Sequence, residues 1–267
     1  MIREPVVAGQ FYSADAKALR QNIQSYFKTP DLLIEAKAIV APHAGYLYSG
    51  AVAGEVYSAI RLPKRFIILG PNHTGRGEAL SLHPAGDWRT PLGLVSIDEE
   101  LNARLLAECS RLCEDRAAHL REHSLEVQIP FLQMLVAEFR FAAICVGTTD
   151  HSALTSLGHA LARVIQSSPE PILLVASSDM THYEPAETAA RQDQHAIDRI
   201  LAVDPDGLYR VVIEKDISMC GFAPTVAALT ACRELGATAG KLIRYTNSGC
   251  VSGDYHSVVA YAGMAVV

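Results

Sequence analysis

The strongest constraint on the fold is an alternation of short, β-branched apolar runs with longer segments of helical periodicity. Six runs are typical of strands: AIVAP, RFIILG, FAAICVG, PILLVASS, KLIRYT and the C-terminal SVVAYAGMAVV. Between them, segments such as HSALTSLGHALARVI and APTVAALTACREL repeat apolar residues at spacings of three and four. This alternation predicts an α/β protein whose central sheet is mostly parallel and covered by helices on both faces.

One segment departs from the alternation. In ALSLHPAGDWRTPLGLVSID, residues 79–98, two short apolar runs flank a turn region with Gly, Pro and Trp. We expect an antiparallel excursion here, and therefore a mixed sheet. Asp98, Ser124 and Ser152 stand where helix N-caps are expected. No repeat and no Gly/Ser/Pro-rich linker divides the chain, so we predict a single domain over residues 1–267.

Composition excludes several classes of partner. The formal charge is −6, and Lys and Arg are scattered rather than clustered, which argues against nucleic-acid binding. No apolar run reaches the roughly 20 residues that span a bilayer. The six cysteines contain no CxxC pair and do not resemble a disulfide framework in a chain this long. We therefore expect a cytoplasmic protein with neither nucleic-acid nor membrane partners.

Reactive side chains follow four of the predicted strands. His43 follows AIVAP, His73 follows RFIILG, Asp179 and His182 follow PILLVASS, and Cys250 follows KLIRYT. In α/β sheets, ligands bind beyond the carboxyl ends of the strands, where loops from several strands converge. His43 and His73 also lie in turns framed by Pro and Gly. Proline fixes one backbone dihedral and glycine permits close approach, so such turns favour preorganised side chains.

Each of these residues also has a structural interpretation. Asp179 and His182, in SSDMTHY, either cap the next segment or form a carboxylate–imidazole pair for general acid–base chemistry. The serines of that segment do not indicate a serine hydrolase, because the chain has no GxSxG motif. His123 precedes a predicted helix start, where it is either a neighbour of the cap or a neutral imidazole that hydrogen-bonds a ligand.

The surroundings of Cys250 differ from those of a core cysteine. It follows Gly249 and precedes a Ser/Gly stretch, whereas Cys145 lies within the apolar AAICVG. A thiol in a polar loop is better suited to metal binding or chemistry than to packing. We therefore favour a functional role for Cys250.

Eight stretches together resemble one known family. They are VAGQFYSAD, VAPHAGYLYSG, FIILGPNHTG, DWRTPLG, EHSLEVQIPFLQ, SSDMTHY, CGFAPTVAAL and SGCVSGDYHSVVAYAG. In order and spacing the chain is similar, nearly end to end, to the Memo family, including the proteins named AmmeMemoRadiSam system protein B. The resemblance implies a fold like that of class III extradiol dioxygenases. It also implies metal ligands at His43, His73 and Cys250, and an acid–base histidine at His182 with Asp179 beside it.

The same resemblance also implies a metal cofactor. Class III extradiol dioxygenases are non-haem iron enzymes, so Fe(II) is the favoured ion. Two histidines and a carboxylate form the usual iron(II) oxygenase site, whereas a thiolate in place of the carboxylate also suits Cu or Zn. Asp179 or Asp254 could supply the missing oxygen ligand, and His123 would hydrogen-bond the bound substrate.

Three functions follow from these expectations. The first is a metal-dependent, dioxygenase-like oxidoreductase acting on a small aromatic or polar substrate. The alternative is a non-catalytic protein that binds a metal or a peptide at a vestigial dioxygenase site, and the third is a zinc hydrolase that uses metal-bound water. The family name further implies a functional link to AMMECR-type and radical-SAM proteins.

Overall fold

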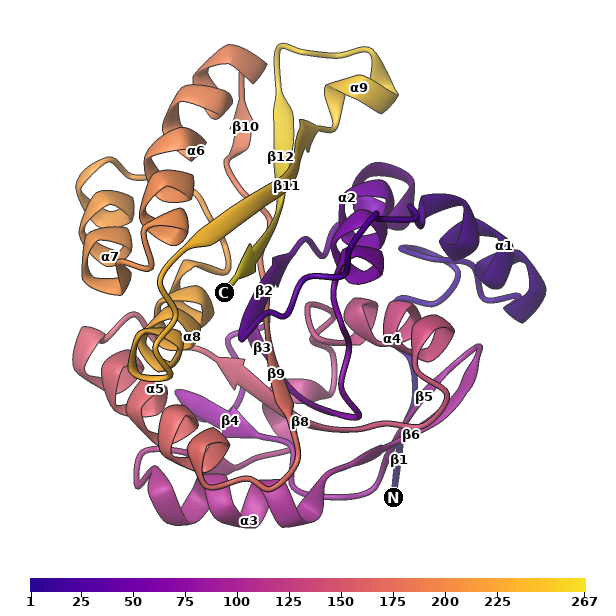
Figure 1. Cartoon of the computed structure of the whole chain (residues 1–267). Helices are drawn as coiled ribbons and strands as arrows, with labels where there is room; N and C mark the ends of the chain where they lie inside the picture. Colours follow the sequence, from indigo (N-terminus) through magenta and orange to yellow (C-terminus); the bar gives the residue numbers. More distant parts are fainter.

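The apolar runs assemble into one mixed sheet in the computed structural model, which describes residues 1–267 (Figure 1). The strands are β1 (Ile2–Arg3), β2 (Ala38–Ala41), β3 (Arg65–Pro71), β4 (Leu80–Leu82), β5 (Asp87–Thr90), β6 (Gly93–Ile97), β7 (Cys113–Glu114), β8 (Arg140–Val146), β9 (Ile172–Ser177), β10 (His182–Glu184), β11 (Gly240–Asn247) and β12 (Val258–Val266). The helices are α1 (Ala16–Tyr26), α2 (Tyr46–Ala59), α3 (Glu99–Glu108), α4 (Ile129–Leu135), α5 (His151–Gln166), α6 (Ala186–Leu201), α7 (Pro205–Glu214), α8 (Phe222–Glu234) and α9 (Gly249–Ser252), with 3-10 turns η1 (Ala117–His119) and η2 (Glu126–Gln128).

The centre of the sheet is parallel. Its main path runs β1-β5-β6-β8-β3-β9-β2-β12-β10, and the stretch from β6 to β2 pairs in parallel throughout. β12 is antiparallel to β2, and β10 and β11 are antiparallel to β12. The predicted mixed sheet flanked by helices is therefore confirmed, and all six predicted strands form. The carboxyl ends of β2, β9 and β3 lie side by side at one edge, where ligand sites of α/β proteins are found.

The excursion at residues 79–98 forms as expected, because β5 and β6 make an antiparallel hairpin. The predicted cap at Asp98 is confirmed by a hydrogen bond that its carboxylate accepts from the Leu101 N–H at 3.0 Å. The prediction for Ser152 is wrong: Asp150 caps α5 and accepts the Ser152 N–H. The Ser124 hydroxyl instead donates to the Pro71 carbonyl, at the end of β3.

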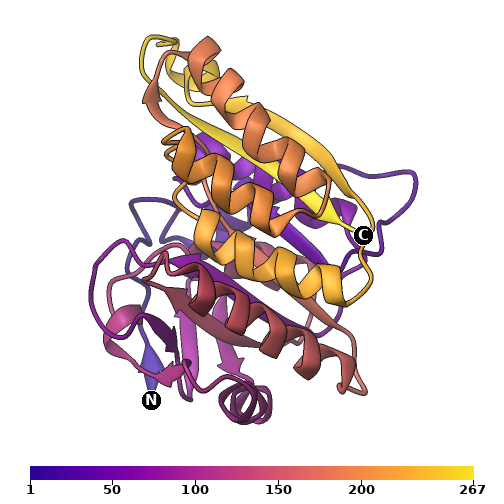
Figure 2. The same ribbon diagram turned by 90° about the vertical axis from the view of Figure 1, so that its left-hand side faces the viewer.

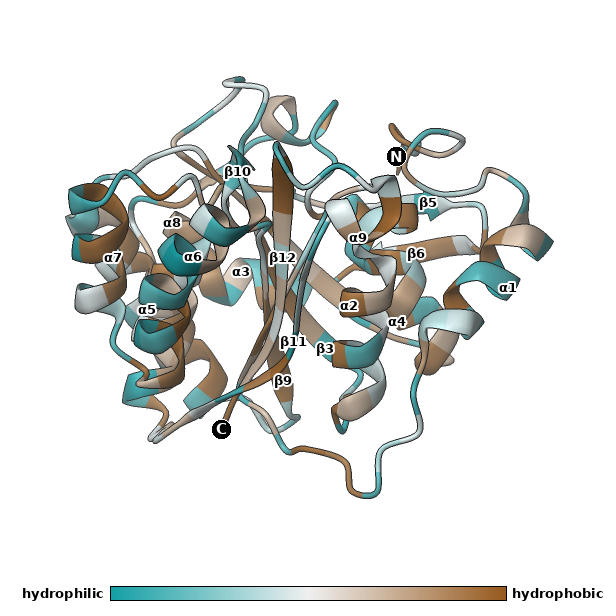
Figure 3. Ribbon diagram, turned by 90° about the horizontal axis from the view of Figure 1, so that it is seen from above, coloured by the Kyte–Doolittle hydropathy of each residue, from teal (hydrophilic) through white to brown (hydrophobic).

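Both faces of the sheet are buried, each in its own hydrophobic cluster. Along β3, Ile67 and Leu69 belong to one cluster, while Phe66 and Ile68 belong to the other. Figure 2 shows α5, α6, α7 and α8 as a row on one face, and Figure 1 shows α1, α2 and α4 on the opposite side. Seen from above, hydrophobic strands lie between helices whose outer surfaces carry hydrophilic residues (Figure 3). None of the helices has the length and apolar character required to cross a membrane.

A buried ion pair fastens the sheet to α3. Arg65, the first residue of β3, donates through Nε to Asp98 Oδ2 at 2.7 Å and through Nη2 to Asp98 Oδ1 at 3.0 Å. Both side chains are almost completely buried. Removal of one partner from such a pair leaves an uncompensated buried charge, which is strongly destabilising.

We predict that Arg65→Met lowers the free energy of unfolding by about 3 to 5 kcal/mol, because the Asp98 carboxylate stays buried without its cation. Arg61→Met is the matched control, since Arg61 pairs with Glu35 at 3.2 Å on the surface with both side chains largely exposed. We expect it to cost about 1 kcal/mol or less. Denaturant unfolding measures both; equal losses would contradict the prediction.

Candidate metal centre

Three imidazoles converge at the carboxyl edge of the sheet. His43 follows β2, His73 follows β3, and His123 lies in the loop before η2. Their potential ligand atoms all lie within 4.8 Å of one another. The His43 ring is buried, whereas the side chains of His73 and His123 remain 34% and 21% exposed, so the cluster is open to solvent on one side.

The tautomer of His43 follows from its neighbours. Its Nδ1 lies 2.9 Å from Ser177 Oγ at the end of β9. The single proton of that hydroxyl is donated to the Ser124 carbonyl at 2.7 Å, so the oxygen can only accept from His43. His43 therefore carries its proton on Nδ1, and its Nε2 presents a lone pair to the cluster. A hydrogen bond of this kind is typical of metal-ligating histidines.

His73 is held in the same way by a carboxylate. Glu122 Oε1 lies 2.9 Å from His73 Nδ1, and Oε2 accepts the His73 backbone N–H at 2.6 Å. A carboxylate accepts hydrogen bonds when ionised, so Nδ1 of His73 carries the proton. The Nε2 atom is left as the lone-pair nitrogen. The fit to a metal is therefore good at two positions, because the sequence supplies both the ligands and the groups that orient them.

His123 completes the cluster. Its ring stacks on that of His73, with centroids 4.7 Å apart and an interplanar angle of 21°. It also meets the rings of Phe11 and His43 edge to face, at centroid distances of 4.8 Å and 5.5 Å. Its Nδ1 lies 3.5 Å from Glu122 Oε1. It stands ahead of η2 and does not cap a helix.

The electrostatics keep His43 and His123 neutral. Burial, together with the charges of the neighbouring histidines, holds the pKa of His43 well below its usual value. Burial also lowers the pKa of His123. For Glu122, burial alone would raise the pKa, but the hydrogen bonds that the carboxylate accepts from His73 and Ser124 outweigh burial and bring the pKa to about 2. An ionised carboxylate beside neutral imidazoles is the protonation state that metal binding requires.

Asp179 contacts the turn that carries His43, and the role expected of it beside His182 stays a prediction. Its Oδ1 accepts the backbone N–H groups of His43 at 2.7 Å and Ala44 at 3.3 Å. The carboxylate therefore fixes the turn that carries His43. Burial raises the pKa of Asp179 to about 6 against the effect of these hydrogen bonds.

His182 lies on β10 and is partly buried. Its N–H donates to Ser218 Oγ at 2.8 Å, and its Nδ1 donates to the Ser218 carbonyl at 2.9 Å. Its Nε2 is consequently the nitrogen that can accept a proton. The acid–base role expected of His182 stays a prediction.

A thiol beside the imidazoles belongs to Cys220, a residue that the sequence patterns alone do not single out. Its Sγ lies 3.2 Å from His43 Nε2 and accepts the Asp179 N–H at 3.3 Å. Gly221 allows this approach: a Cβ there would come within 2.2 Å of the Ser177 carbonyl oxygen. The signal in the sequence was the motif CGFAP, in which Gly follows the cysteine at the start of a helix.

Cys250 is not brought into the cluster. It lies exposed on the four-residue helix α9, where its sulfur accepts the Thr246 hydroxyl at 3.2 Å. Asp254 lies in the same loop, and its Oδ1 accepts the His256 N–H. The ligand role expected of Cys250 stays a prediction that this arrangement does not support.

Comparisons with known proteins identify the family of this chain. The Memo family, described as Memo-like protein, matches residues 3–265. The chain is 42% identical to a MEMO1 family protein of Methanopyrus kandleri, over 99% of this chain and 98% of that protein. It is also 42% identical to a MEMO1 family protein of Aquifex aeolicus, with 98% of each chain covered.

A solved structure supports the fold alone. An uncharacterized protein from Escherichia coli K12 superposes with a TM-score of 0.62 at 14% identity, covering 86% of this chain and 100% of that one. The family match covers nearly the whole sequence and includes all three clustered histidines. This chain therefore belongs to the Memo family.

Proposed function

We propose that the protein binds a divalent or redox-active metal ion through Nε2 of His43 and His73 and acts as an oxidoreductase on a small aromatic or polar substrate. The observation that carries the proposal is the pair of Nδ1 hydrogen bonds to Ser177 and Glu122, which turns both Nε2 lone pairs toward one centre. The third ligand would be His123, which belongs to the same group, or Cys220, whose thiol lies beside His43.

Fe(II) is the favoured ion because of the resemblance to class III extradiol dioxygenases. Imidazole ligands suit iron, copper and zinc alike, and a thiolate would shift the preference toward Cu or Zn. When bound, a redox-active ion would supply electron transfer between the substrate and an oxidant such as dioxygen. The partly exposed sides of His73 and His123 leave room for a substrate to reach the centre.

Protein side chains would transfer the proton, bind the substrate and position the metal ligand. His182 would accept and return the substrate proton at Nε2, since its Nδ1 is committed to the Ser218 carbonyl. Where Cys220 is the third ligand, His123 would be left to hydrogen-bond the substrate; Asp179 would hold the His43 turn in place. A functional link to AMMECR-type and radical-SAM proteins stays a prediction from the family resemblance.

A non-catalytic metal-binding role is the second candidate, and one observation favours it. The ligand atoms that lie within 4.8 Å of one another belong to three imidazoles and include no carboxylate. The cluster therefore lacks the carboxylate of the two-histidine, one-carboxylate pattern of iron(II) oxygenases. This difference favours a site that holds an ion without catalysing a reaction.

Metal content of the purified protein tests the binding site. We expect about one ion per chain in the wild type, and less than a tenth of that in His43→Ala and His73→Ala, because each removes an oriented ligand. Cys220→Ser and Cys250→Ser form a matched pair: loss of metal in the first alone would identify Cys220 as a ligand. Loss in Cys250→Ser alone would contradict the arrangement described above, and full occupancy in His43→Ala would refute the site. Elemental analysis of anaerobically purified protein also identifies the ion.

Oxygen uptake distinguishes the two functions. With Fe(II) loaded, an oxidoreductase is expected to consume oxygen in the presence of dihydroxylated aromatics, and His182→Gln should keep its metal while turnover falls roughly 100-fold or more. A metal-loaded wild type that consumes no oxygen with any member of the panel would favour the non-catalytic role.

Glu122→Gln tests the orienting carboxylate. An amide offers one oxygen where the carboxylate offers two, so it cannot accept from both the N–H and Nδ1 of His73 in the present geometry. We expect metal affinity to fall roughly 10- to 100-fold, measured by competition with a chelator of known affinity. Glu108→Gln is the control. Glu108 lies on α3 and pairs with Arg163 at a partly exposed position, so this change should leave the metal affinity unchanged.

A further inference from the structure

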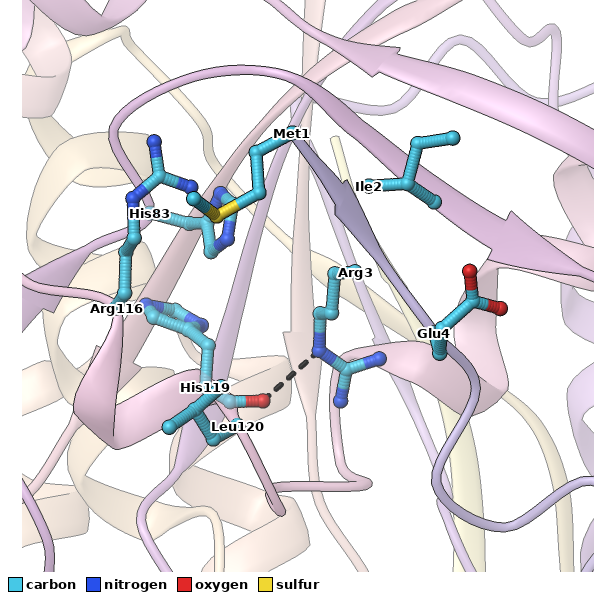
Figure 4. Close-up of a pocket in the computed structure, with 8 residues that line it drawn as sticks. All are labelled: Met1, Ile2, Arg3, Glu4, His83, Arg116, His119 and Leu120. Carbon is cyan, nitrogen blue, oxygen red and sulfur yellow. Dashed lines mark hydrogen bonds between the residues drawn. The ribbon is translucent and has the colours of Figure 1, made fainter.

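A second pocket lies between the N-terminal segment and η1. It has a volume of about 290 Å³ and is lined by residues of the N-terminal segment and by two histidines and their neighbours, namely Met1, Ile2, Arg3, Glu4, His83, Arg116, His119 and Leu120. In Figure 4, His83, His119 and Arg116 stand on one side of this space and Ile2, Arg3 and Glu4 on the other. None of these residues belongs to the candidate metal centre.

The His119 ring, which belongs to a residue lining the pocket, has one nitrogen without a hydrogen-bond partner in the protein. Its Nε2 lies 3.1 Å from the Ser81 carbonyl, which can only accept, so Nε2 carries the ring proton. Nδ1 is therefore the lone-pair nitrogen, and it has no hydrogen-bond partner within the protein. The residue is only 1% exposed. Buried polar atoms are usually paired, so an unpaired acceptor on a pocket wall points to a ligand group that donates to it.

A second imidazole repeats the pattern. His83 is 4% exposed, and its Nδ1 also lacks a partner within the protein. The two rings meet edge to face with centroids 5.3 Å apart. Burial, as the largest effect, lowers the pKa of His83 to about 3 and that of His119 to about 4, so both are neutral near pH 7.

The charges around the pocket exclude a cation. The Arg3 guanidinium lies over the Trp88 ring at 4.0 Å, and its Nε donates to the His119 carbonyl at 2.8 Å. Arg116 donates to the Ala85 carbonyl at 3.3 Å and forms no ion pair in the chain. The one acid on the lining, Glu4, pairs with Arg89 at 3.1 Å. A metal ion or an ammonium group would meet net positive charge here, whereas an anion would find an unpaired guanidinium.

We propose that this pocket binds a short hydroxy acid, with its carboxylate on the Arg116 guanidinium and its hydroxyl donating to His119 Nδ1. The apolar side chains of Met1, Ile2 and Leu120 would cover the carbon chain between the two polar ends. A hydroxyl is preferred to an amine as the donor because it brings no positive charge next to Arg3. The combination of an apolar wall with a few directed polar groups is typical of small-molecule sites.

The pocket is separate from the metal centre, although Arg3 contacts both regions. Arg3 Nη2 donates to the Glu122 carbonyl at 2.6 Å, and the Glu122 side chain holds His73. The proposal does not depend on the function proposed for the metal centre. A variant of that centre can therefore serve as a control for binding at the second pocket.

Chemical-shift titrations of the full-length protein test the proposal with three matched sets of probes. The hydroxy acids are 3-hydroxypropanoate, 4-hydroxybutanoate and 5-hydroxypentanoate, the parent acids lack the hydroxyl, and the corresponding diols lack the charge. We expect at least one hydroxy acid to bind roughly tenfold more tightly than its parent acid, because only it satisfies the buried acceptor. The diols should bind more weakly than either acid, because they lack the carboxylate.

Two variants assign the contacts in the pocket, and a third tests whether the probes bind at the metal centre instead. His119→Gln keeps a donor for the Ser81 carbonyl but removes the acceptor, so the hydroxy acid should bind no better than its parent acid. Arg116→Gln, at a half-buried surface position, should weaken both acids roughly tenfold or more. His73→Ala should leave all affinities unchanged. Binding that is lost in His73→Ala, that shows no preference for the hydroxyl, or that is absent for every probe would overturn the proposal.

Discussion

The Ser177 hydroxyl is the junction on which the candidate metal centre depends. It accepts from His43 Nδ1 and from Gln128 Nε2 at 2.8 Å, and it donates to the Ser124 carbonyl. One buried oxygen thus joins the exits of β2 and β9 to the loop that carries His123 and to the turn before α4. Its full set of partners leaves no freedom in the direction of its proton, and this fixes the His43 tautomer.

The Glu126 carboxylate is a second buried group that fixes the same loop. The Glu126 carboxylate accepts the N–H groups of Val6 and Val7 and the Tyr12 hydroxyl, and it pairs with Arg3 at 2.7 Å. These contacts draw the N-terminal segment under η2 and place Phe11 against the His123 ring. The third imidazole is therefore positioned by a segment more than a hundred residues away in sequence, through a charge that is almost completely buried.

Sequence reasoning located the parts of the site that follow directly from parallel strands. His43 and His73 were predicted because each follows a buried apolar run, and such strand ends meet at one edge. Glu122 and Ser177 could not be predicted as orienting groups, because their roles depend on which loops pack together. Cys220 was missed because it precedes a helix and does not follow a strand, so the search for strand exits passed over it.

The placement of Cys250 shows the limit of that search. β11 runs in the same direction as β2, since both are antiparallel to β12, so its end was expected at the same edge. The register places Val40 opposite Met264 and Met264 opposite Leu242, yet β11 continues to Asn247. Past a register shift Arg244 pairs with Gly263, the level at which β2 ends with Ala41, so β11 extends about three residues, or roughly 10 Å, beyond that level. A strand exit predicts a site residue only when its strand ends level with its neighbours, and length is set by pairing partners that one sequence does not reveal.

The choice between His123 and Cys220 as third ligand has a chemical consequence. His43 and His123 are already neutral near pH 7, since burial keeps their pKa values low, and an ion that binds to these two imidazoles displaces no proton from them. Burial raises the pKa of the Cys220 thiol, so that group enters the site protonated and close to the His43 lone pair. Ligation by Cys220 would have to release this proton, and metal affinity would then rise with pH in a way that a purely imidazole site would not. The sulfur beside His43 thus decides whether the centre behaves as a plain histidine site or as one coupled to protons.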